Sequence, residues 1–380
     1  MTLYTKIDKC RICGNSRLVP VLDLGEQLEH SYNLSEMYGE NYGYRSGLNA
    51  SMVKHLNNKV NKILELVELS EGDLVIDIGS NDSTTLRAYP LNGSILVGVD
   101  PTGSKFHEYY PSHVSLIPDF FSSRLIRSAF PNKKAKIITS FSMLYDLENP
   151  VSFMEEIHEV LADDGVWVFE QSYMPSMLET NSYDTVCHEH LEYYSLSQIV
   201  WMADRVGFTI KDVQFNSVNG GSFSVTVEKA KGNESHSSTV NDILETEKRL
   251  GLDSLSPYLE FSKKVEKTKS DLIEFISKTK HDGKNIYALG GSTKGNVLLQ
   301  YCGLTADDVP YIGEINEDKF GRYAPGSYIP IISEDVLLDK NPDLLIVLPW
   351  HFKDFFVSSN KFSGIELVFP LPSVTSVKIG

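Results

Sequence analysis

Cysteine, positive charge and long apolar runs are all scarce in this chain of 380 residues. Four cysteines are too few for a disulfide scaffold at this length. The 35 Lys and Arg against 51 Asp and Glu give a formal net charge of −16, which repels nucleic acid and anionic membranes. No run approaches the ~18 consecutive apolar residues of a spanning helix, and the first residues lack a signal-peptide pattern. We therefore expect a cytoplasmic protein without nucleic-acid or membrane partners.

Enough apolar sequence is present for a folded protein of two or three domains, since hydrophobic residues make up 41% of the chain. A helical period runs from about residue 51 to 69, and short apolar runs then alternate with helical patterns. The runs at 74–78, 95–99, 137–139 and 166–169 are expected strands of a parallel sheet buried on both faces. A helix is expected after Asn149 as cap and Pro150 as first residue, with Gly165 as a stop.

The later part of the chain predicts an antiparallel hairpin, then helices, then a second sheet. The hairpin strands are expected at 208–215 and 222–227, joined through Asn219-Gly220-Gly221. Residues 229–280 are charged and helical and predict a bridging pair of helices. The second set of strands is expected at 285–289, 309–312, 344–348 and 366–369. We therefore expect a doubly wound α/β protein with two separate sheets.

One glycine loop indicates a nucleoside cofactor. The first predicted strand ends in Asp77-Ile-Gly79-Ser-Asn81-Asp82, and the next ends about twenty residues later in Asp100. A dinucleotide would need G-x-G-x-x-G, and only Gly79 is present. Asp77 and Asp82 would flank a cationic ligand better than a pyrophosphate, which favours S-adenosylmethionine (SAM). The alternative is a ligand-free turn of the same shape.

Three further clusters carry candidate chemistry. Cys10-x-x-Cys13 has the spacing of one zinc knuckle but supplies only half of a tetrahedral site, so two reduced surface cysteines are the alternative. Residues 183–194 gather two histidines, three carboxylates and three tyrosines, which indicates a reaction centre or else a hydrogen-bonded loop anchor. A zinc site at His188 and His190 is less favoured because no third ligand at suitable spacing is evident. The loop 290–296 predicts an anion site at a helix N-terminus, or simply a tight turn.

Taken together, these motifs make the chain resemble the bacterial nucleotide-sugar 3-C-methyltransferases, which are SAM-dependent sugar C-methyltransferases with an N-terminal zinc module and a C-terminal α/β domain. The resemblance covers nearly the whole chain. It rests on Cys10-x-x-Cys13, Met37-Tyr-Gly-x-x-Tyr-Gly-Tyr-Arg-Ser-Gly47, the loop from Asp77 to Gly79 with Asp100, Glu170-Gln171, Tyr183-Asp-Thr-Val-Cys-His-Glu-His190-Leu-Glu-Tyr-Tyr194, Gly220-Gly221-Ser222, Gly291-Ser-Thr-Lys-Gly-Asn296, Gly321-Arg-Tyr-x-Pro-Gly326 and Leu348-Pro-Trp350.

The resemblance implies an α/β fold with a Rossmann-like class I methyltransferase domain, a second C-terminal Rossmann-like α/β domain and a short N-terminal module with a truncated zinc knuckle. The expected divisions are 1–50 for the zinc module and the substrate and cofactor loop, 51–230 for the SAM-binding domain, 231–282 for a helical linker, and 283–380 for a nucleotide-sugar-binding domain. A monomer acting on a nucleotide-diphospho-keto-deoxysugar is expected.

The implied reaction is methylation at C3 of a nucleotide-linked 4-keto-6-deoxysugar. A ketone beside the target carbon acidifies its C–H bond, so a histidine can remove the proton to give an enolate. By resemblance His190 is the base, while His188, Glu189 and Tyr183 orient it or stabilise the enolate oxygen. A small-molecule O-methyltransferase and a non-catalytic sugar-nucleotide-binding protein remain the alternatives.

The resemblance also implies the binding residues. Those expected at the cofactor are Tyr42, Tyr44, Ser46, Asp77, Gly79, Asn81, Asp100, Asp119, Phe120 and Ser140. Those expected at the substrate are Tyr193, Asn219, Ser292, Thr293, Lys294, Asn296, Glu314, Asn316, Lys319 and Arg322. Cys10 and Cys13 are the expected zinc ligands.

The chain departs from the family pattern in two places. A second cysteine pair and some tens of residues are lacking near the Gln27–Leu28 junction, so the chain has either lost half of its zinc module or lacks residues there. Many relatives also carry a histidine after the third core strand, where this chain has Tyr145-Asp146. The role of that histidine does not transfer, and Asp146 is the candidate to orient in its place.

Overall fold

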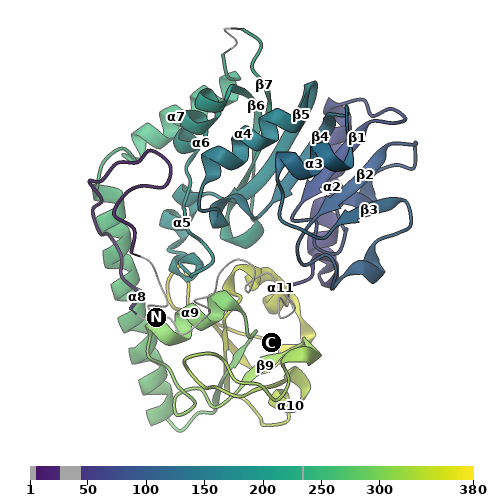
Figure 1. The fold of residues 1–380 in the computed structure, drawn as a ribbon. Coiled ribbons are helices and arrows are strands. Elements are labelled where there is room, and N and C mark those ends of the chain that lie inside the picture. The colour runs from purple at the N-terminus through teal and green to yellow at the C-terminus, as the bar shows by residue number, and fades with distance from the viewer. Residues whose placement is uncertain (1–5, 26–43, 233–234) are drawn as a thin grey trace. The chain divides into compact units, whose positions relative to one another are not determined.

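The computed structural model describes residues 6–25, 44–232 and 235–380 (Figure 1), which fall into two compact units. The first unit contains the described residues of 6–18, 44–173 and 191–249, and the second contains those of 19–25, 174–190 and 250–380. Tyr42 and the Gln27–Leu28 junction lie outside the described residues.

The first unit is built on a seven-stranded sheet in the order β3-β2-β1-β4-β5-β7-β6. Its strands are β1 (Leu74–Ile78), β2 (Ile95–Val99), β3 (Val114–Ile117), β4 (Ala135–Phe141), β5 (Leu161–Ser172), β6 (Phe208–Asn216) and β7 (Ser222–Lys229). Strands β1 to β5 pair in parallel, and β7 runs antiparallel to both β5 and β6. The predicted parallel sheet finished by a hairpin is confirmed, and it is the Rossmann-like arrangement that the resemblance implied.

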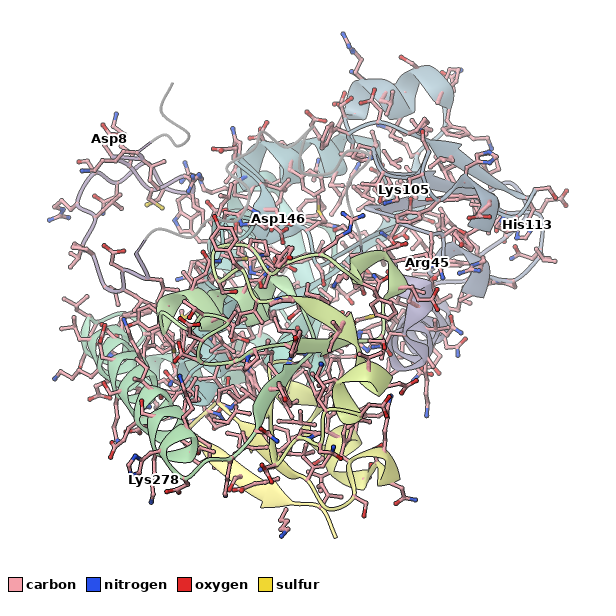
Figure 2. The ribbon with its side chains drawn as sticks, turned by 90° about the horizontal axis from the view of Figure 1, so that it is seen from below. Asp8, Arg45, Lys105, His113, Asp146 and Lys278 are labelled. Carbon is pink, nitrogen blue, oxygen red and sulfur yellow. The ribbon has the colours of Figure 1, made fainter. Side chains whose placement is uncertain are left out.

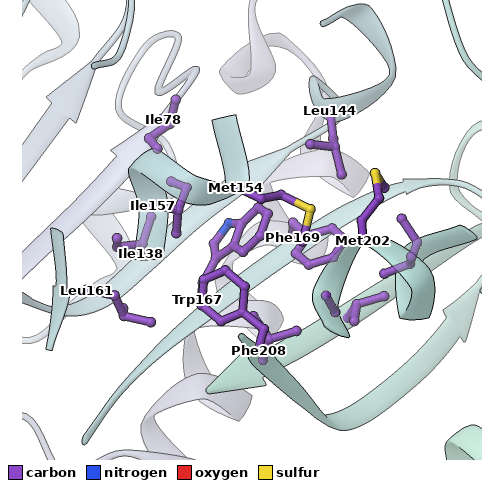
Figure 3. Packing of buried hydrophobic residues seen from close by; sticks show 14 of the residues in the cluster. Ile78, Ile138, Leu144, Met154, Ile157, Leu161, Trp167, Phe169, Met202 and Phe208 are labelled. Atoms are coloured by element: carbon purple, nitrogen blue, oxygen red, sulfur yellow. The ribbon is translucent and has the colours of Figure 1, made fainter. Parts of the chain in front are cut away.

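Helices cover both faces of this sheet. The larger core packs α3 (Ser123–Ala129), α4 (Pro150–Val160), α6 (Leu196–Val206) and α7 (Ser238–Arg249) on one face, around a fully buried Trp167 (Figure 3). On the other face, α2 (Ala50–Leu66) buries Val60 and Ile63 against alternate residues of the same strands. Because side chains alternate along a strand, neighbouring residues of β5 serve different cores. This alternation decides where the polar residues at its end point.

Local sequence explains how the helices begin and end. The Asn149 side chain accepts a hydrogen bond from the Ser152 amide and Pro150 opens α4, as predicted. Ser195 and Gln198 form a capping box at the start of α6, and Gly207 ends it with a φ of 90° that favours glycine.

The second unit carries its own six-stranded sheet in the order β10-β9-β8-β11-β12-β13. Its strands are β8 (Ile286–Leu289), β9 (Ile312–Glu314), β10 (Ile331–Ser333), β11 (Leu344–Val347), β12 (Glu366–Phe369) and β13 (Thr375–Lys378), the last of which is antiparallel. Its helices are α5 (Met174–Thr180), α8 (Ser256–His281), α9 (Thr293–Tyr301), α10 (Glu334–Leu338) and α11 (Lys353–Ser358). The order reverses between β8 and β11, so α9 begins at the switch point where such sheets bind ligands.

Four expectations need correction. β3, β10 and β13 were not predicted; β3 begins directly after His113 (labelled in Figure 2). The strand expected at 309–312 lies at Ile312–Glu314. Gly165 does not stop α4 but lies inside β5, since the helix already ends at Val160. The segment 174–190 belongs to the second unit rather than to the sheet of the expected 51–230 domain. No helix among the described residues is long and apolar enough to cross a membrane.

Candidate active site

The glycine loop after β1 is held in shape by Asp100. One carboxylate oxygen of Asp100 accepts the Asn81 amide at 2.7 Å, and the other accepts both the Thr102 amide and hydroxyl at 2.6 Å. Gly79 has a φ of +71° and is exposed, and a Cβ built on it would meet only Met143, at 3.9 Å. The loop therefore offers open backbone beside a carboxylate that can accept one more hydrogen bond, at the oxygen that accepts only the Asn81 amide.

Tyr44 and Ser46 lie against the same loop. The Ser46 amide donates to the Asn81 side chain at 2.9 Å, and the Asn81 amide group donates back to the Tyr44 carbonyl at 3.0 Å. The Gly47 amide donates to Asp82 at 2.9 Å, and a Cβ at Gly47 would fall on that carboxylate. The structure thus brings together three of the residues predicted for the cofactor, and it explains why glycine stands at position 47.

Two other predicted cofactor residues line a hollow formed by α3 and the loop that precedes it. Its volume is about 650 Å³ and its walls include Asp119 and Phe120. Phe120 is 41% exposed, so its ring is available to a flat ligand.

Asp77 and Ser140 point away from this surface. The Asp77 carboxylate accepts the Thr139 hydroxyl at 2.6 Å in the interior, and burial, with the charge of Asp100 adding to it, raises its pKa to about 7. The Ser140 hydroxyl accepts the Trp167 indole N–H at 3.0 Å within the core. Both residues therefore support the loop from beneath, which a motif alone does not reveal. Tyr110, whose hydroxyl bonds both Ser80 and the Asn81 carbonyl, is a loop support that the sequence gave no signal for.

The segment 183–194 is divided between the two units after His190. In the second unit, the short helix η5 (Tyr183–Thr185) packs against α9. Tyr183 is 0% exposed, with its hydroxyl 3.8 Å from the Cys302 sulfur and its ring edge-on to Tyr301. Tyr183 is thus buried as an interior anchor of this segment.

His190 is fixed by the backbone of the same segment. Its Nδ1 lies 2.8 Å from the Thr185 carbonyl oxygen. A carbonyl oxygen only accepts, so Nδ1 carries the proton and Nε2 of the neutral ring is left as the basic nitrogen. Burial and, next to it, the ammonium of Lys294 lower the pKa of His190 to about 4. The ring is therefore neutral at physiological pH.

Lys294 brings the predicted anion loop into the same cluster. Burial lowers its pKa, against the opposing charges of Asp184 and Cys187. Asp184 accepts the Trp350 indole N–H at 2.9 Å, and burial raises the pKa of its carboxyl. His351 is a further member that the sequence did not signal: burial and then Lys294 lower its pKa to about 3. Residues far apart in sequence thus surround one buried ammonium in the second unit.

The loop that carries Lys294 is tightly built. Gly290 has a φ of +81° and a Cβ there would collide with Pro349 at 2.6 Å, while the Ser292 hydroxyl caps α9 by accepting the Gly295 amide at 3.1 Å. Glu314 accepts the Gly291 amide at 3.0 Å, and Lys319 donates to the Gly291 carbonyl at 2.7 Å. These two predicted substrate contacts are therefore occupied in clamping Gly291.

The remaining predicted substrate residues are spread over both units. In the second, Thr293 opens α9, Asn296 is buried within it, Asn316 caps η7 (Glu317–Lys319), and Arg322 is exposed. In the first, Tyr193 is half-buried and Asn219 lies in the turn η6 (Val218–Gly220) between β6 and β7.

Three side chains that could bind a metal ion lie close together at a place that the sequence spacing did not favour. Donor atoms of Cys187, Glu189 and His190 lie within 4.8 Å of one another, so a third ligand type does stand near His190. His188 lies beside Glu189, with 3.7 Å between the imidazole Nε2 and the carboxylate. Residues Cys10 to Cys13 form a backbone turn, with the Gly14 amide donating to the Cys10 carbonyl at 2.9 Å. Among the described residues, no third ligand joins those two cysteines.

Comparisons with known proteins match most of the chain. Residues 52–213 match a family described as methyltransferase domain, and residues 217–372 match one described as C-methyltransferase C-terminal domain. The C-methyltransferase NovU of Streptomyces niveus is 25% identical over an alignment 403 positions long, gaps included, which covers 96% of this chain and 96% of that protein.

Solved structures resemble about half of the chain. The complex of LepI with SAM is 14% identical, with a TM-score of 0.37, and covers 48% of this chain and 54% of that one. A putative methyltransferase of Bacillus halodurans C-125 is 12% identical, with a TM-score of 0.36, and covers 46% of this chain and 100% of that one.

Proposed function

We propose, from the premise that the chain is a SAM-dependent C-methyltransferase, that it methylates C3 of a nucleotide-linked 4-keto-6-deoxysugar with His190 as the base. The observation that carries the proposal is the hydrogen bond from His190 Nδ1 to the Thr185 carbonyl. It places the proton of the neutral imidazole on Nδ1, so that Nε2 is the basic nitrogen. C-methylation requires such a base because carbon must first become a carbanion equivalent.

The residues around the first glycine loop suit a sulfonium nucleoside. Asp100 would accept the ribose hydroxyls, the exposed Gly79 admits close approach of the ligand, and the hollow beside Asp119 and Phe120 would take the flat base. When bound, the cofactor supplies an electrophilic methyl group. The net acidity of the chain does not oppose this cation.

The second unit would hold the diphosphate of the sugar nucleotide. A diphosphate fits the start of α9, where Ser292 and Thr293 open the helix and Lys294 supplies a positive charge. A dianion beside Lys294 would also offset the charge that lowers the pKa of His190, so binding would make the base stronger.

The reaction would have two steps at C3, removal of a proton and transfer of the methyl group. His190 Nε2 takes the C3 proton, and the electrons of that C–H bond become an enolate delocalised onto the C4 ketone oxygen. Carbon C3 bonds to the methyl group while the bond between that group and its sulfur breaks. His188 and the buried residues of the segment 183–190 orient the substrate.

Four free cysteines accord with a reducing compartment, and we place the reaction in the cytoplasm.

We also propose that Cys10 and Cys13 hold zinc weakly. Burial raises the pKa of the Cys10 thiol, but the backbone amides of Cys13 and Ile12 outweigh burial and the pKa is lowered. A thiolate-favouring turn suits a metal, yet two ligands fill half of a tetrahedron.

The test is a mass-spectrometric screen in which the protein and SAM are incubated with dTDP-, GDP- and CDP-linked 4-keto-6-deoxysugars. A methyl-sized gain on one of them, with loss of deuterium from a C3-deuterated substrate, supports the proposal. A gain that retains the C3 deuterium would indicate an O-methyltransferase instead. No gain with any sugar nucleotide would contradict the proposal.

A further inference from the structure

A fully buried amide at the carboxyl end of β5 has no hydrogen-bond partner. Gln171 is 0% exposed, and neither its amide nitrogen nor its amide oxygen is bonded to any group within the described part of the chain. Buried polar groups of native proteins are nearly always bonded, because leaving them dry is costly. The partner of Gln171 therefore lies outside the described residues.

A second unpartnered polar group lies on the same face of the sheet. Tyr194 is 1% exposed, and its hydroxyl has no partner among the described residues. Tyr194 bridges in parallel to Tyr173, which lies two residues beyond Gln171 and so shares its side of the sheet. Both tyrosines belong to the core cluster on that face. Two buried groups without partners thus point to one region of the first unit.

Carboxylates complete this polar group. One oxygen of Glu192 is buried without a partner and the other is 3.7 Å from Arg11, and burial raises the Glu192 pKa to about 7. The charges of Glu192 and Asp146 (labelled in Figure 2) both act on the Tyr194 hydroxyl, so both lie near it. The amide of Glu192 donates to the Tyr145 carbonyl just after β4, which fixes the group at the carboxyl ends of β4 and β5. Ligands of parallel sheets bind at this edge.

We propose that Gln171, Tyr194 and Glu192 form a recognition site for the hydroxyl and keto groups of the sugar ring. The proposal rests on the proposed function, because it takes the substrate to be a sugar. The site offers donors from the amide and the phenol and acceptors from the amide and the carboxylate, which matches a ring bearing both types of group. Neighbouring carboxylates disfavour an anion, so the diphosphate is not the occupant.

Arg11 ties the N-terminal turn to this site. Its guanidinium lies 3.3 Å from Glu148 and 3.7 Å from Glu192, and it follows directly after Cys10. The Cys10–Cys13 turn therefore serves to place a cation over the carboxylates of the sugar site.

The experiment compares Gln171→Leu, Tyr194→Phe and the matched control Tyr89→Phe. Tyr89 is also a buried hydroxyl without a partner among the described residues, but it belongs to the core on the opposite face. Binding of dTDP-4-keto-6-deoxyglucose, of dTDP alone and of S-adenosylhomocysteine is measured by calorimetry, and the melting temperature is measured without ligand. If a sugar linked to another nucleotide is methylated in the screen, that keto sugar nucleotide and its nucleoside diphosphate replace the dTDP pair.

The site predicts that Gln171→Leu weakens binding of the keto sugar nucleotide by about 5- to 150-fold and leaves dTDP and S-adenosylhomocysteine binding unchanged. The melting temperature without ligand rises by about 2–4 °C, because the variant no longer buries an amide group without hydrogen-bond partners. Tyr194→Phe shows the same selectivity with a smaller loss, and Tyr89→Phe shows none.

Three outcomes overturn the site. A fall in the melting temperature of Gln171→Leu would mean that the amide has a structural partner. Unchanged sugar-nucleotide binding in both variants would mean that the groups hold only water. A wild type that binds dTDP but no keto sugar nucleotide overturns the proposed function together with this one, whereas variants that bind like a competent wild type overturn this one alone.

Discussion

Replacing Asp100 separates the two roles that its carboxylate has in the structure. Asp100→Ala removes the proposed acceptor of the ribose hydroxyls, which costs about 1–3 kcal/mol of binding free energy, or roughly 5- to 150-fold in affinity for S-adenosylhomocysteine. It also strips the buried Asn81 and Thr102 amides of their partner, so the free energy of unfolding should fall by about 1–3 kcal/mol. Calorimetry and urea unfolding measure the two effects independently.

A matched variant shows which role dominates. Thr102→Val removes one 2.6 Å bond to Asp100 but leaves the carboxylate for the ligand, so it should retain near wild-type affinity at a modest cost in stability. Asp100→Asn keeps one acceptor oxygen and should lie between Ala and wild type. Unchanged affinity in Asp100→Ala would remove Asp100 from the cofactor site. Equal losses in Thr102→Val and Asp100→Ala would mean that loop collapse, and not a lost ligand contact, explains the effect.

Three other predictions follow from single groups. Purified protein should hold far less than one equivalent of tight zinc at Cys10 and Cys13, and a full equivalent by metal analysis would contradict the half-site. Lys294→Met should raise the pKa of His190 above about 4. Activity requires the neutral imidazole and is lost as pH falls through that pKa, so the acid limb of the kcat/KM profile should move to higher pH. An unmoved acid limb would refute the effect of Lys294 on His190. Glu170→Gln should lower the free energy of unfolding by about 3–5 kcal/mol, because Glu170 is 4% exposed and pairs with His55 at 2.6 Å and Lys59 at 2.8 Å. Burial raises the pKa of Glu170, but these partners outweigh burial and the pKa is lowered. The contribution of Glu170 to the free energy of unfolding is therefore present above the ordinary carboxylate pKa and is lost as pH falls through the folded-state pKa. If the variant shows wild-type acid sensitivity in urea unfolding, this reasoning is contradicted.

The elements that the sequence predicted are those with one continuous apolar run. β1, β2 and β12 were placed residue by residue because each is buried along almost its whole length. β3 and β13 were not predicted because their residues are mostly half-exposed or exposed, so neither strand has a continuous apolar run. The strand β9 was misplaced because Val309, a buried residue outside any strand, looks like the start of one.

The site was predictable at the level of motifs but not of side-chain direction. The Asp100 loop follows from the spacing of its motif, whereas Tyr44 and Ser46 were assigned to the cofactor by the resemblance alone. Tyr183 lies in a motif full of polar groups, yet only tertiary packing against α9 decides that it is interior. The association of Lys294 with His190 joins two distant segments, and no local pattern encodes it. The dry amide of Gln171 is likewise visible only once its neighbours are known.

Solvent exchange at C3 of the sugar tests the central claim most directly, because it reports proton removal without methyl transfer. Wild-type protein in deuterated buffer, with S-adenosylhomocysteine in place of the methyl donor, should exchange the C3 proton of the 4-keto sugar nucleotide. His190→Asn should bind both ligands yet lose exchange and methylation by about 10²–10⁴-fold, while His188→Asn loses less. Near-normal exchange and turnover in His190→Asn, with collapse in His188→Asn, would contradict the account and move the base to His188.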